Sequence, residues 1–150
     1  MFTTNVIRMK TGIDFSEPIM QVIERLLQEH KDLYPILDSI DNECKENPHG
    51  AVKMMKDVKP RILRHSVEEE ARVIKLIMQN AKAESGESVE IMQEHRWVVE
   101  FLERRLDSLS NLNPSQISKE ITQFDKDLKE HFHEEEQVVY PLALKLINKK

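Results

Sequence analysis

The chain has 150 residues, a length that suits one domain with a core large enough to need neither disulfides nor a structural metal. Charged residues make up 33% and aromatic residues 5%, and there are only three glycines, a balance typical of long amphipathic helices and poor for sheets. The formal net charge of -5 and the lack of a basic cluster argue against a nucleic-acid partner.

The first half of the chain predicts an N-terminal arm and two helices. Residues 1–15 fit neither the helical nor the strand period, and we interpret them as an arm. The first helix opens at Ser16, with a serine cap and a proline in its first turn, and runs to about Glu46. A stop at residues 47–50 separates it from a second helix over about 51–80.

The second half predicts two more helices. A loop over residues 81–88, closed by a Ser-Gly-Glu-Ser turn, precedes the third helix. Asn113 and Pro114 have the form of a cap and first residue of the fourth, which runs to near Asn148. Long helices joined by short loops fold back on one another, so we expect residues 16–150 to form an all-α, up-down-up-down four-helix bundle.

One histidine falls near the middle of each predicted helix: His30, His65, His95 and His131. Two of them carry a glutamate one turn later, which pairs His65 with Glu69 and His131 with Glu135. Residues at i and i+4 project from the same helix face, so each pair presents a ring nitrogen and a carboxylate to one point. Along the chain this gives a two-fold repeat of His followed by His-x-x-x-Glu.

The four histidines also fall at similar heights in the predicted bundle. At 1.5 Å per residue, the two histidines of each half are level to within about 5 Å. The two halves match only if the second helix ends near Asn80, because an unbroken helix to Ser85 would place His95 about 15 Å too low.

Histidines that converge inside a bundle are either core residues or metal ligands. As core residues, four of them would need hydrogen-bond partners for eight ring nitrogens. As ligands, imidazole and carboxylate without thiolate suit iron, zinc or manganese. Two carboxylates among four imidazoles can bridge two cations, as in other bundle-core dimetal sites. The pattern therefore favours a metal centre.

These residues resemble the pattern of the hemerythrin-like HHE cation-binding domains over about residues 18–147. The similarity is carried by His30, His65-Ser-Val-Glu-Glu69, His95, and the run from His131-Phe-His-Glu-Glu135 to Pro141. The resemblance implies a non-haem di-iron centre with a bridging oxo or hydroxo group. It also implies that Glu69 and Glu135 bridge the irons, with His30 and His65 on one iron and His95 and His131 on the other.

The chain departs from the oxygen-carrying members of that family at one position. Where they have a second histidine one turn after the third-helix histidine, this chain has Val99. Six protein ligands then leave an open position on each iron, which favours chemistry with small oxidants over reversible oxygen carriage. Tyr34, one turn after His30, is a candidate cofactor-binding residue; the alternative is a core tyrosine with its hydroxyl at the rim.

We therefore expect a di-iron protein that binds or reacts with dioxygen, peroxide or nitric oxide, in sensing, stress response or iron handling. Whether it turns over as an enzyme stays open. One alternative is a ferritin-like iron site, which needs Glu-x-x-His on two helices. Glu130 with His133 and Glu46 with His49 match by letter, but the second pair crosses the proline turn. The other alternative is a metal-free helical interaction module.

The chain also carries signals about its compartment. A single cysteine, Cys44, cannot form an internal disulfide and fits a reducing compartment. No apolar stretch approaches the roughly 20 residues needed to cross a bilayer, and no signal peptide is evident. We expect a cytoplasmic protein without a membrane partner. Bundle subunits often pair, so the sequence leaves a homodimer open.

Overall fold

The computed structural model describes residues 13–80 and 85–148, with the backbone alone at 85–89, 91 and 148. These residues form helices and no strand: α2 (Ile19–Glu46), α3 (Pro48–Glu69), η1 (Glu70–Ile74), α4 (Lys75–Asn80), α5 (Ser85–Glu100), η3 (Phe101–Arg105), α6 (Leu106–Ser108), η4 (Leu109–Asn111), α7 (Pro114–Glu134), η5 (Glu135–Val139) and α8 (Tyr140–Asn148). None of the described helices is both long and apolar enough to cross a membrane.

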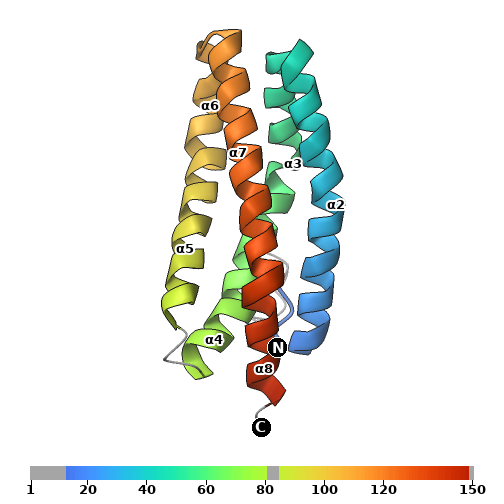
Figure 1. The fold of residues 1–150 in the computed structure, drawn as a ribbon, viewed down its shortest axis with the longest axis vertical. Coiled ribbons are helices and arrows are strands. Elements are labelled where there is room, and N and C mark those ends of the chain that lie inside the picture. The colour runs from blue at the N-terminus through green and yellow to red at the C-terminus, as the bar shows by residue number, and fades with distance from the viewer. Residues whose placement is uncertain (1–12, 81–84, 149–150) are drawn as a thin grey trace, which may run out of the picture.

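The helices join into four long rods that run alternately up and down (Figure 1). The rods are α2, then α3 continued by η1 and α4, then α5 continued as far as η4, and finally α7 continued by η5 and α8. The segments η1, η3 and η5 are five-residue π-helical turns inside these rods. The predicted all-α four-helix bundle is confirmed.

The junction between the first two rods is tighter than predicted. The first helix ends at Glu46 as predicted, but Asn47 alone separates it from α3, which begins at Pro48 and not at about residue 51. The Asn47 side chain caps the new helix by accepting a hydrogen bond from the Gly50 backbone N–H at 3.2 Å. A Cβ on Gly50 would lie 2.5 Å from Nδ2 of Asn47, so the capping contact needs glycine here.

Two further boundaries differ from the prediction. The serine cap is wrong: α2 begins at Ile19, and the backbone N–H and hydroxyl of Ser16 donate instead to Asp14, at 3.0 and 2.6 Å. Residues 85–88 are helical backbone rather than a turn. The remainder of the predicted loop, residues 81–84, lies outside the described residues. Residues 1–12 of the predicted arm lie outside them as well.

Other predicted boundaries are confirmed. The second rod ends at Asn80, which is the boundary that the height argument required. Asn113 and Gln116 form a reciprocal capping box in front of α7: the Asn113 side chain accepts from the Gln116 backbone N–H at 2.9 Å. The first of these boundaries affects the height of His95 in the third rod, and the second affects the height of His131 in the fourth.

The apolar interior is split into two clusters along the bundle axis. The first core runs from Leu33 on α2 to Phe132 on α7, and the second core runs from Val22 on α2 to Leu146 on α8. On every rod the predicted metal-ligating histidine falls between residues of the two cores. A polar layer therefore separates two apolar cores.

One acidic pair, a buried aspartate beside a half-buried one, lies away from that layer. Asp125 on α7 is completely buried. Neither of its carboxyl oxygens, nor Oδ1 of Asp41 on α2, has a hydrogen-bond partner among the described residues. A proton on Asp125, donated to Asp41, satisfies both groups, and burial together with Asp41 raises the pKa of Asp125 to about 9.

Candidate metal centre

The polar layer brings together side chains from all four rods. It contains the six predicted ligands His30, His65, Glu69, His95, His131 and Glu135. Each of them is at most 5% exposed, and the two glutamates are completely buried. The i and i+4 spacing works as expected, because Glu69 and Glu135 lie on the same helix face as the histidine one turn before them. A buried layer of this composition needs either cations or protons to balance it.

The six side chains form two four-residue clusters that share both glutamates. We call His30 and His65 with Glu69 and Glu135 the first subsite, and His95 and His131 with the same glutamates the second subsite. Within each subsite the four ligand atoms lie within 4.8 Å of one another.

The two glutamates contact histidines on both sides. Glu135 places Oε1 3.1 Å from Nε2 of His30 and Oε2 3.1 Å from Nε2 of both His95 and His131. Glu69 places Oε2 3.6 Å from Nε2 of His65 and Oε1 2.9 Å from Nε2 of His95. The two carboxylates therefore lie where a bridge between two cations would need them.

Each histidine is oriented by a further carboxylate on its outer ring nitrogen. Nδ1 of His30 lies 2.8 Å from Glu136, and Nδ1 of His65 lies 2.6 Å from Glu29. On the other side, Nδ1 of His95 lies 3.1 Å from Glu70, and Nδ1 of His131 lies 2.7 Å from Glu94. A carboxylate only accepts, so each Nδ1 carries the hydrogen, and in a neutral ring Nε2 is left as a bare lone pair facing the centre. Carboxylates in this outer position are what metal-ligating histidines ordinarily have.

These outer carboxylates were not among the sequence predictions, although the sequence contains a signal for them. Each half of the chain carries a Glu-His pair and then His-x-x-x-Glu-Glu. In each half, the glutamate before the first histidine bonds the second histidine, as Glu29 bonds His65. The glutamate after the shared one bonds the first histidine of the other half, as Glu136 bonds His30. The repeat is therefore two-fold in space as well as in sequence.

Two π-helical turns coincide with this arrangement. η1 begins at Glu70, directly after the shared Glu69, and η5 begins at the shared Glu135 itself. A π turn inserts one extra residue into an α-helix and shifts the phase of the residues after it, and such turns are frequent at functional sites. Here the outer glutamates Glu70 and Glu136 lie within the two turns.

Without bound metal, the pKa values of the four histidines in the layer are shifted in opposite directions. Burial alone lowers the pKa of His65, but hydrogen bonds to Glu29 and Glu69 outweigh it and raise the pKa to about 9. Burial is likewise outweighed at His95, whose pKa is raised to about 9 by its glutamate partners. Burial and the neighbouring His65 lower the pKa of His30 to about 4, and burial lowers the pKa of His131. Without cations, the layer is balanced by protons on His65 and His95.

Two tyrosines join the layer. Tyr140, which the sequence analysis did not single out, is buried and donates its hydroxyl hydrogen to Glu69. Tyr34 donates to Oε2 of Glu136 at 3.0 Å, the same oxygen that lies 2.8 Å from Nδ1 of His30. Tyr34 is thus connected to the layer through Glu136, and its direct contact with a cofactor stays a prediction.

The donor set fits a pair of cations. Nε2 of His30 and Nε2 of His65 face each other at 3.0 Å. Oε1 of Glu69 and Oε1 of Glu135 have ring nitrogens close by but no aligned hydrogen-bond partner among the described residues. Electron-pair donors converging in a buried space, with oxygens left unsatisfied, are what two bound cations would explain.

A comparison with protein families identifies the family of the chain. The Hemerythrin HHE cation binding domain matches residues 21–143, well over half of the chain. The chain belongs to this family. Comparisons with curated proteins and with solved structures found no match.

The other positions considered in the sequence of this hemerythrin HHE domain lie outside the two subsites. Val99, at the position of the missing seventh ligand, is 37% exposed and contributes no atom to the buried clusters. His49 and His133 are exposed and lie outside both subsites. Of the six histidines, four therefore face this hemerythrin HHE centre, in the pairs that the resemblance implies.

Proposed function

We propose that this hemerythrin HHE domain is a non-haem di-iron protein that binds or reacts with dioxygen, peroxide or nitric oxide. The observation that carries the proposal is the pair of buried four-ligand subsites that share Glu69 and Glu135. Imidazole and carboxylate ligands suit iron, and the buried Cys44 is part of neither subsite. The proposed cofactor is two iron ions with a bridging oxo or hydroxo group.

Bound iron would supply the electrons and the open coordination positions for small oxidants. The chain's own residues supply the rest. The four outer glutamates fix which nitrogen of each ring faces inward. The two apolar cores shield the layer from bulk water above and below. The Tyr140 hydroxyl holds a hydrogen at Glu69, beside the place where a small ligand would bind.

The arrangement disfavours the ferritin-like alternative. Its two Glu-x-x-His pairs would have to face the centre, but His133 and Glu130 are both exposed on α7. Glu46 and His49 are likewise exposed. The metal-free interaction module is separated from our proposal by the experiment below.

The test is the metal content and near-ultraviolet spectrum of protein purified in air. We expect close to two irons per chain, with charge-transfer bands of a ferric pair, and loss of both in the double variant His65→Ala, His131→Ala. The matched control is His49→Ala, His133→Ala, which removes two exposed histidines and should keep metal and spectrum. A folded wild-type protein that neither contains nor takes up metal would refute the proposal and favour the interaction module.

A further inference from the structure

The two-fold repeat provides an internal comparison between the two sides of the metal centre. His30 corresponds to His95, a shift of 65 positions, and His65 corresponds to His131, a shift of 66. The surface between α2 and α3 on one side is therefore the counterpart of the surface between α5 and α7 on the other. Differences between the two surfaces indicate what each half does beyond holding ligands.

The surface over the first subsite carries arginines and salt bridges. A hollow of about 360 Å³ between α2 and α3 reaches His65, but Arg61 and Arg64 line it. Arg25 on α2 makes two contacts to Glu68, at 2.6 and 2.5 Å, and one to Glu17 at 2.6 Å. Arg72 on η1 donates to the backbone carbonyls of Asp14 and Glu17, which holds the segment before α2 against the same side. Bidentate arginine–carboxylate pairs of this kind are well defined in geometry.

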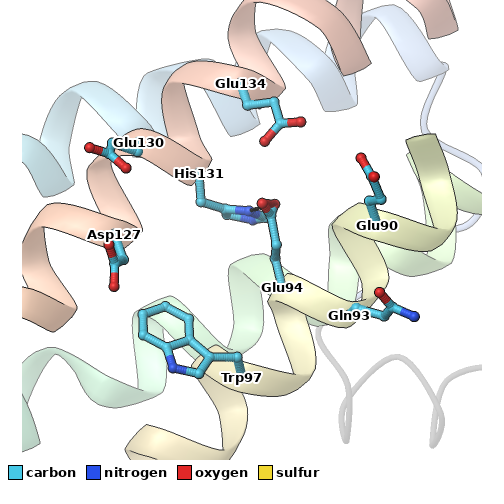
Figure 2. A pocket seen from close by; sticks show the side chains of 8 residues that line it. All are labelled: Glu90, Gln93, Glu94, Trp97, Asp127, Glu130, His131 and Glu134. Atoms are coloured by element: carbon cyan, nitrogen blue, oxygen red, sulfur yellow. Dashed lines mark hydrogen bonds and ion pairs between the residues drawn. The ribbon is translucent and has the colours of Figure 1, made fainter.

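The counterpart surface over the second subsite has a larger hollow and carries the opposite charge. The positions equivalent to Arg25 and Arg64 are Glu90 and Glu130. Between α5 and α7 lies a hollow of about 620 Å³ (Figure 2). Its carboxylates are Glu90, Glu94, Asp127, Glu130 and Glu134, and no lysine or arginine among the described residues lines it.

The hollow ends at a ligand of the second subsite. His131 forms its inner wall, is 5% exposed, and is held by Glu94, which also lines the hollow (Figure 2). Behind His131, the second subsite contains Oε1 of Glu69. That oxygen is completely buried, and its neighbour Nε2 of His95, 2.9 Å away, is not aligned for a hydrogen bond; no other partner lies within the described part of the chain. A buried, unsatisfied carboxylate oxygen behind an acidic opening points to a cation as the occupant.

We propose that the hollow between α5 and α7 is the route by which divalent metal cations reach the centre, and that Glu90 and Glu130 attract them to it. The inference rests on the proposed dimetal site and adds the side from which it is loaded. An acidic opening raises the local concentration of cations and their association rate, and this effect falls with ionic strength. The hollow on the first side has Arg61 and Arg64 in its lining, which disfavour the approach of cations to His65.

The test measures how fast the metal-free full-length chain takes up Co²⁺, followed by stopped-flow visible absorbance. In Glu90→Gln, Glu130→Gln we expect loading about threefold slower or more at low salt. The difference should vanish at about 1 M salt, where the Debye length is about 3 Å. The final cobalt stoichiometry should equal that of wild type, because neither side chain belongs to the subsites.

Two further variants sharpen the test. Glu90→Arg, Glu130→Arg copies the arginines of the first side and should slow loading more than the glutamine pair. The control Glu24→Gln, Glu46→Gln removes the same charge from exposed positions on α2 and should load like wild type. Circular dichroism checks that each variant is folded.

The outcomes separate the two proposals. Equal loading rates in wild type and both hollow variants at low salt would overturn the route, and so would equal slowing by the control. A reduced final stoichiometry in the glutamine pair would also overturn it, because the glutamates would then be ligands. If wild type takes up no cobalt at all, the dimetal site itself fails.

Discussion

Replacing Asp125 by asparagine should change how the stability of the protein depends on pH. In the folded chain the pKa of Asp125 is about 9, against a reference value of 3.8. Between these two values the folded state holds one proton that the unfolded state has released. The free energy of unfolding therefore falls by about 1.4 kcal/mol per pH unit as the pH rises through this window.

The size of the effect at neutral pH can be worked out from that slope. From pH 3.8 to pH 7, protonating Asp125 costs the folded state up to about 4 kcal/mol, a cost that asparagine does not have. The amide can donate to Asp41 in place of the shared proton, but its second N–H is left buried without a partner, at about 1–3 kcal/mol. We expect Asp125→Asn to be more stable than wild type at pH 7 and above, and less stable at pH 4.

Urea denaturation at a series of pH values between 4 and 9 checks this reversal in the order of stability, with wild type and variant in the same metal state. Asp57→Asn, which changes an exposed aspartate on α3, should differ from wild type by no more than about 0.5 kcal/mol. A stability difference between Asp125→Asn and wild type that stays constant over the whole pH range would refute the reasoning, because the buried carboxyl would then not hold the extra proton.

Three further predictions concern the metal centre. Tyr140→Phe removes the hydrogen bond to Glu69, which both subsites share, and should weaken iron binding, measured by chelator competition, with helicity unchanged. Glu29→Gln replaces a charged acceptor by a neutral one and should lower metal affinity about 10–100-fold, whereas Glu24→Gln, on the exposed face of α2, should not. Metal binding near pH 7.5 should release up to two protons, detected with an indicator dye in weak buffer, because His65 and His95 have pKa values of about 9; absence of release would contradict this charge assignment.

The helices and the levels of the ligands could be predicted because they depend on local signals. Apolar periodicity and the Asn113–Pro114 cap defined the rods, and residue counts placed His95 level with the other ligands once the second rod ended at Asn80. The serine cap failed because Asp14, two residues earlier, binds the hydroxyl of Ser16. A cap is a competition between nearby acceptors, and spacing alone does not decide it.

The contacts between rods could not be read from the sequence in the same way. Glu29 is adjacent to His30 in sequence, yet it bonds His65 on the next rod. Glu68, three residues after His65, is 1% exposed and paired with Arg25 on the first rod, a contact that the sequence does not indicate. Which side chain on a neighbouring rod meets a given ring depends on the rotation of each rod, and one sequence does not fix that rotation.

The position of the polar layer between two apolar cores has a consequence for how the molecule opens. Each core is a separate set of contacts, and the layer between them, without cations, is joined mainly by proton-mediated contacts. Amide hydrogen exchange resolves such units when they open independently. We expect the backbone amides at the two ends of the metal-free bundle to differ in protection from exchange. Cations bound at the layer should join the two ends into one cooperative unit, so metal binding should change amide exchange far from the ligands.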